Sequence, residues 1–78
     1  MTFDEATARL VAMAREHNGS VTAAQVEADE ALSSDKNVVS AAARALAGGT
    51  NVFSAIDEDG RSWFPYSTLT FAELPARR

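Results

Sequence analysis

The sequence predicts a small α+β domain in which three helices precede a two-stranded antiparallel β-hairpin. The first half of the chain holds three segments with apolar residues at helical spacing, each opened by a threonine or a serine. The second half changes to β-branched and aromatic residues on both sides of Asp59-Gly60, a pair typical of a hairpin turn. A single domain over 1–78 is therefore expected, with helices over about 3–16, 23–31 and 35–47, strands over about 52–57 and 61–67, and a C-terminal tail over 68–78.

The first expected helix begins at a capping box. The Thr2 hydroxyl can accept a hydrogen bond from an early backbone N–H, and the Glu5 carboxylate can accept one from the N–H of Thr2. Mostly apolar residues then recur at helical spacing: Phe3, Ala6, Leu10, Met13 and His17. Asn18-Gly19 is a pair that ends helices well, so the helix is predicted to stop at about Glu16.

The second and third expected helices also carry their own start and stop signals. Thr22 to Gln25 forms another capping box, and the valines at 21 and 26 occupy the positions of a hydrophobic staple. This helix is expected to end around Ala31, and Leu32-Ser33-Ser34 then forms the link to the third helix. Either Ser33 or Ser34 is expected to cap the third helix, which Gly48-Gly49 ends.

The Asp59-Gly60 turn sets the register of the expected hairpin. A two-residue type I′ turn there places Ile56 opposite Trp63 and Phe53 opposite Tyr66. The face expected to cover the helices is Phe53, Ala55, Phe64 and Tyr66. The outer face is Val52, Ser54, Ile56, Trp63 and Pro65.

The tail allows two interpretations. Thr70 to Glu73 matches a third capping box and predicts one helical turn before Pro75. Its apolar residues are also expected to cover Ile56 and Trp63, which otherwise form an exposed patch for a partner: Leu69, Phe71 and Leu74.

Composition narrows the function. Seventy-eight residues suffice for one small core and no enclosed substrate chamber. No cysteine is present, and a lone histidine argues against zinc, so no metal and no cofactor are expected. No nucleophile elbow, glycine-rich phosphate loop or acid/base pair appears, so enzyme activity is not expected. No apolar run approaches the roughly 20 residues that span a membrane, which predicts a cytoplasmic protein without a membrane partner.

The candidate reading surface is the solvent side of the third helix: Lys36, Asn37, Ser40, Ala41 and Arg44. Positions 37, 40 and 44 share one helical face. Asparagine and arginine can make bidentate contacts to adenine and guanine edges in the major groove of DNA. An ordinary solvated helix face is the equal alternative. The formal net charge of −4 and the carboxylates of Asp57-Glu58-Asp59 oppose binding by phosphate neutralisation.

From Thr22 to about Tyr66 the chain resembles the winged helix-turn-helix superfamily of bacterial transcription regulators. The segments that carry the resemblance are VTAAQVEADEALSS, DKNVVSAAARALAGG and VFSAIDEDGRSWFPY. The resemblance implies that 22–31 buttresses the helix over 34–47, which reads the major groove. It assigns base or phosphate contacts to Lys36, Asn37, Ser40 and Arg44.

Three functional hypotheses follow. The first is a small DNA-binding transcription regulator, alone or as a homodimer, with its third helix in the major groove. The second is a winged-helix interaction module that binds a protein partner through the acidic wing or the Ile56 and Trp63 patch, without DNA. The third is a non-winged α+β domain whose hairpin packs elsewhere.

Overall fold

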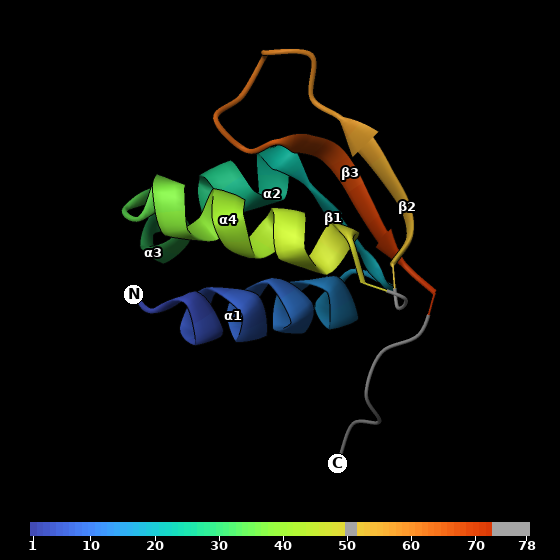
Figure 1. Ribbon diagram of the computed structural model, residues 1–78, viewed down its shortest axis with the longest axis horizontal. Helices are drawn as coiled ribbons and strands as arrows, with labels where there is room; N and C mark the ends of the chain where they lie inside the picture. The colour runs from blue at the N-terminus through green and yellow to red at the C-terminus, as the bar shows by residue number, and fades with distance from the viewer. Residues whose placement is uncertain (50–51, 73–78) are drawn as a thin grey trace.

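The computed structural model describes residues 1–49 and 52–72, which form an α+β fold with four helices and a three-stranded antiparallel sheet (Figure 1). The predicted class is therefore confirmed, while the architecture holds one helix and one strand more than expected. The elements are α1 (Phe3–Glu16), β1 (Ser20–Thr22), α2 (Ala23–Ala28), α3 (Glu30–Ser33), α4 (Lys36–Ala47), β2 (Val52–Asp57) and β3 (Tyr66–Phe71).

The sheet has the order β1-β3-β2, so the last strand in the chain is the central one. β3 pairs antiparallel with both neighbours, and Leu69 lies between Val21 of β1 and Ala55 of β2. Figure 1 shows the helices on one side of this sheet, with α1 running alongside α4. The strand β1 was not predicted, because three residues between a helix stop and a capping box carry no strand periodicity of their own.

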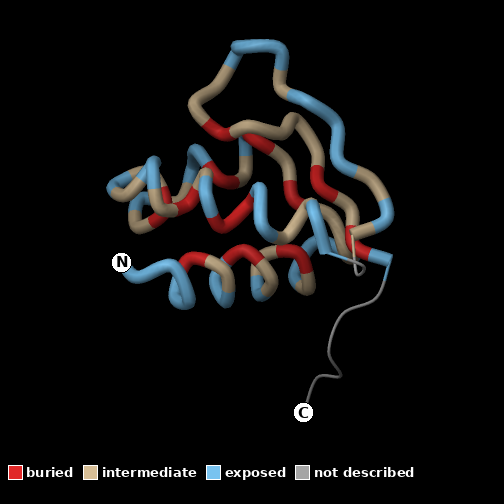
Figure 2. The backbone as a smooth tube through the Cα atoms, viewed as in Figure 1, coloured by how far each residue is buried: buried red, intermediate tan, exposed pale blue. Residues whose placement is uncertain are grey.

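The buried residues form one core cluster, and Figure 2 shows that they lie where the helices and the sheet face one another. Seven large side chains are almost completely excluded from solvent: Phe64, Leu10, Leu32, Leu69, Val21, Val26 and Val39. Alanines of α1 and α4 lie between them and let these two helices approach closely: Ala6, Ala14, Ala42 and Ala43.

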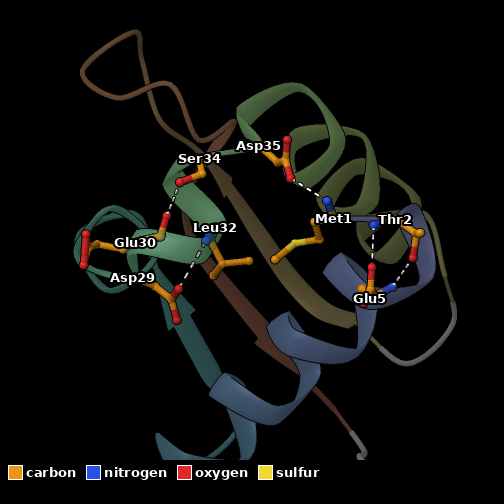
Figure 3. A network of polar contacts seen from close by, with 8 residues as sticks. All are labelled: Met1, Thr2, Glu5, Asp29, Glu30, Leu32, Ser34 and Asp35. Atoms are coloured by element: carbon orange, nitrogen blue, oxygen red, sulfur yellow. Dashed lines mark hydrogen bonds and ion pairs between the residues drawn. The ribbon is translucent and has the colours of Figure 1, made fainter.

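Two of the three predicted capping boxes are confirmed, those at Thr2 and Thr22. The Glu5 N–H donates to the Thr2 hydroxyl at 3.1 Å, and the Glu5 carboxylate accepts from the Thr2 N–H at 2.8 Å (Figure 3). Gln25 and Thr22 make the same reciprocal pair at 3.2 and 3.0 Å. The stop after α1 is also confirmed, because Asn18 and Gly19 adopt left-handed backbone angles, with φ of 59° and 92°.

The expected helix over 23–31 is two helices, and Asp29 separates them. Its backbone is extended, with φ −87° and ψ 112°, and its carboxylate caps α3 by accepting from the Leu32 N–H at 3.2 Å. The Arg9 guanidinium of α1 pairs with the same carboxylate at 3.1 Å. The helix breaks here because a cap and a long-range ion pair both act on this side chain.

The serines predicted to cap the third helix have other roles. Ser34 ends α3, and its hydroxyl donates to the Glu30 carbonyl at 2.8 Å (Figure 3). The residue before α4 is Asp35, which makes no side-chain cap. Its carboxylate instead accepts from the Met1 amino group at 2.7 Å, so an ion pair ties the start of α1 to the start of α4.

The expected register of the hairpin is wrong. Asp59 and Gly60 do turn, with φ of 63° and 79°, but the second strand starts at Tyr66 instead of residue 61. Ile56 lies opposite Thr68 instead of Trp63. The chain stays irregular over 58–65 because Phe64 is drawn into the core and Pro65 has no N–H to donate to a strand.

The expected faces of the hairpin are reversed at the start of β2, whereas Ile56 is exposed as predicted. Phe53 is 78% exposed, whereas Val52 packs against the core opposite Phe71. A bulge between Val52 and Ser54 sets this alternation. On the other side of the turn, the prediction that Phe64 and Tyr66 contact the core is confirmed.

The tail expected over 68–78 begins later than predicted. Thr70 and Phe71 belong to β3, so the third capping-box match does not open a helical turn there. Leu69 and Phe71 are buried in the core instead of folding over an outer patch. The other residues of that prediction, Leu74, Glu73 and Pro75 among them, lie outside the described residues.

Asp29 is expected to make stability depend on pH. Partial burial alone would raise the pKa of Asp29, but the hydrogen bonds from the Leu32 N–H and Arg9 and the Arg9 charge lower it below its usual value. A carboxyl with a lowered folded pKa stabilises the protein above its unfolded pKa, and that contribution is lost as pH falls through the folded pKa. The free energy of unfolding should therefore drop as pH falls below about 5.

Urea unfolding followed by circular dichroism checks this. At pH 7, Asp29→Ala should cost about 1–2 kcal/mol, because it removes a cap and an ion pair together, and the variant should lose less stability on acidification. Glu27→Gln, a change at an exposed carboxyl of the neighbouring helix, should cost less than about 0.5 kcal/mol. Equal costs for the two variants would contradict the role of Asp29.

Candidate nucleic-acid interface

The helix α4 presents a continuous solvent-exposed face. Asn37, Ala41 and Arg44 follow one another at i, i+4 and i+7, and all three are exposed. Ala45 extends the same face, and Lys36 is exposed in the first turn. Between Asn37 and Arg44 the only side chain on this face is the small one of Ala41, so a binding partner can approach the helix backbone closely.

The charges on α4 are all positive. Lys36 and Arg44 are its only charged residues. The nearest acid along the chain, Asp35, is paired with the Met1 amino group, and the hydrogen bond and charge of Asp35 raise the pKa of that amine. In the part of the chain that the structure describes, the ion pairs are Met1–Asp35 and Arg9–Asp29, and neither cation of α4 pairs with a described carboxylate.

Ser40 lies at the border of this face and not on it. Its side chain is half-buried, and its hydroxyl donates to the Trp63 carbonyl at 3.5 Å. The structure thus brings three of the four predicted contact residues, Lys36, Asn37 and Arg44, to the free surface of α4. The fourth joins the helix to the loop over 58–65.

That loop is packed against the helices by aromatic side chains. Phe64 is fully buried and makes edge-to-face contacts with Trp63 and Tyr66, with ring centroids 5.9 and 6.3 Å apart. Its N–H donates to the Ser62 hydroxyl at 3.2 Å. The loop tip is exposed at 59–61, and it therefore offers carboxylate and guanidinium groups from a fixed base.

The predicted partner patch is not a cross-strand pair. Ile56 is 54% exposed on β2, while Trp63 is half-buried in the loop and packs against the core. The exposed side chain that the sequence reasoning missed is Phe53, 78% exposed on the same strand as Ile56. Only the true register could have identified it, because alternation counted from Asp59-Gly60 places it inside.

Among residues 1–49 and 52–72, no group of three or more His, Asp or Glu side chains is placed to hold a metal ion. Within the same residues, no helix has the length and apolarity needed to cross a membrane.

Comparisons with protein-family models, with curated proteins and with solved structures find no match for this chain. The features of this chain that bear on function are therefore its fold and the exposed face of α4.

Proposed function

We propose that this protein binds double-stranded DNA by placing α4 in the major groove, as a winged helix-turn-helix domain does. The observation that carries the proposal is the exposed face of α4, on which Asn37 and Arg44 stand on either side of Ala41. Both side chains can make bidentate contacts to base edges, and an alanine between them permits close approach. The major groove of B-DNA is wide enough to admit an α-helix such as α4.

The arrangement around α4 supports the proposal. The helices α2 and α3 precede α4 with short connections, and the loop over 58–65 is attached to α4 through Ser40 and Trp63. An antiparallel sheet of order β1-β3-β2 supports that loop. A recognition helix flanked by a supporting helix and a hairpin loop is the docking unit expected for this class.

The charge distribution determines how such binding would work. The chain carries a formal net charge of −4, so its overall charge does not attract phosphates, and Lys36 and Arg44 supply a local positive charge on α4. Lys36 stands in the first turn of α4, where the helix dipole also favours a phosphate. We therefore expect weak non-specific binding and a larger share of affinity from base contacts than in a basic DNA-binding domain.

Titration of the ¹⁵N-labelled protein with mixed-sequence duplex DNA at low salt tests the proposal. Amide shifts should concentrate in 36–48. Arg44→Ala should weaken binding by about 1–3 kcal/mol if it contacts a base edge. Lys36→Ala should lower the slope of log affinity against log salt by about one.

The matched control is Arg9→Ala, which removes the same charge from α1. It should cost stability through Asp29 but leave the affinity of the folded protein for DNA close to that of the parent. The absence of detectable affinity for mixed-sequence duplexes at low salt would overturn the proposal. Equal losses of DNA affinity in Arg9→Ala and Arg44→Ala would show that binding depends on net charge and not on contacts made by α4.

A further inference from the structure

The strand β2 is an edge of the sheet. It pairs with β3 on one side, and among the described residues no strand pairs with its other side. Alternate N–H and C=O groups on the free side of an edge strand remain available for pairing with another chain. The opposite edge, β1, offers much less, because it is three residues long and its Thr22 side chain caps α2.

The side chains along this edge are unusual for an exposed strand. The first five residues of β2, 52–56, carry no charge, and two of them are large exposed apolar side chains. Phe53 is 78% exposed and Ile56 is 54% exposed. Proteins commonly protect such an edge with lysine, proline, a bulge or a covering element, and within residues 1–49 and 52–72 this strand has only the bulge at Phe53. An apolar, uncharged edge is typical of a strand that pairs with a partner.

Carboxylates follow directly where the apolar part of the strand ends. Asp57 is the last residue of β2, and Glu58 and Asp59 continue into the loop, with Asp57 and Asp59 exposed. None of the three is in an ion pair among the described residues. The edge therefore changes character along the strand: residues 53–56 are uncharged and mostly apolar, and residues 57–59 are anionic.

We propose that β2 is a docking edge for an extended segment of a partner protein, in which Lys or Arg residues precede alternating apolar residues. The order follows from the direction of the strand. In an antiparallel pair the N-terminal end of the added strand lies beside the C-terminal end of β2, where the carboxylates are. The following apolar side chains then lie beside Phe53 and Ile56, and the added backbone pairs with the free edge.

Charge favours a cationic partner over a second copy of this chain. Each copy has a formal net charge of −4, so two copies repel one another at long range, whereas a cationic segment is attracted. None of the residues assigned to DNA contact belongs to this edge, so peptide binding at β2 and DNA binding by α4 can fail independently.

The test uses the full chain and a blocked synthetic peptide of sequence RRKVTVTVT. Saturable binding is expected by calorimetry, with amide shifts centred on 52–59 in the ¹⁵N-labelled protein. The control peptide EEEVTVTVT should bind far more weakly, and added salt should weaken the cationic peptide. Asp57→Asn, Glu58→Gln and Asp59→Asn combined should weaken binding roughly tenfold at low salt and flatten its salt dependence.

Phe53→Lys is the second variant, because it places a cation on the edge without disturbing a buried group. It should weaken the RRKVTVTVT peptide roughly fivefold or more, while Phe3→Ala, at an exposed aromatic residue of α1, should have no effect. Equal binding of the two peptides, or shifts centred on α4, would overturn the inference. Sedimentation that reveals a dimer abolished by Phe53→Lys would also overturn it, in favour of a second copy at this edge.

Discussion

Phe64→Ala is expected to lower the free energy of unfolding by about 3–5 kcal/mol, which is the usual cost of removing a buried phenylalanine side chain. Phe64 is fully excluded from solvent and is the largest of the completely buried side chains. Its ring holds Trp63 and Tyr66 in edge-to-face contacts, so the truncation leaves a cavity and releases the loop together. Small domains have total stabilities of about 5–15 kcal/mol, so this change should leave the protein marginally folded at 25 °C.

Phe53→Ala is the matched control, since the residue type and the hairpin are the same. Phe53 is 78% exposed, so its truncation should change stability by less than about 0.5 kcal/mol. Urea unfolding followed by circular dichroism and by the fluorescence of the single tryptophan, Trp63, measures both variants. The pair also tests the register, because the hairpin expected from the Asp-Gly turn alone would place both phenylalanines inside. A large cost at Phe53 would support that register against the one described here.

Leu32→Ala is expected to cost about 2–5 kcal/mol. Leu32 is completely buried, although in the sequence it is part of the polar link before the third predicted helix. The four-residue helix α3 has too few backbone bonds to be stable by itself, so its position depends on this side chain and on the Asp29 cap. Loss of the side chain should therefore loosen the connection that sets the position of α4.

Leu32→Met is the matched control, because it keeps both the volume and the apolar character of the side chain. A methionine fills a similar volume and should cost less than about 1.5 kcal/mol. Amide hydrogen exchange in the two variants measures the local effect, and Leu32→Ala should reduce protection in α3 and at the start of α4. A cost for Leu32→Ala within about 0.5 kcal/mol, the range of surface substitutions, would contradict the packing of α3.

The helices of this chain were largely predictable because their signals are local. A capping box needs a threonine and a residue three positions later, and both boxes form as the spacing at Thr2 and Thr22 predicts. Asn18-Gly19 likewise ends α1 through its own backbone angles. The exposed positions of Lys36, Asn37 and Arg44 follow from helical periodicity in the same way. The use of each as a DNA contact is a proposal that the titrations above test.

The errors arise where a residue interacts with a distant part of the chain. Asp29 breaks a continuous helical pattern because Arg9 and a new cap act on it. Ser40 leaves the predicted reading face because the loop carbonyl of Trp63 accepts its hydroxyl. Neither interaction has a signal in the spacing of neighbouring residues.

The sequence by itself determined where α1 begins and ends, where α4 ends, where the chain turns at Asp59-Gly60, and which side of α4 is polar, because each depends on residues within one or two turns of each other. Only the tertiary structure decided that β1 exists and that β3 is central. It also decided that Phe64 is buried while Phe53 is exposed. A strand acquires its register from its partners, and a shift of one residue moves each side chain to the other face. The choice between the two phenylalanines therefore required the packing of the whole core.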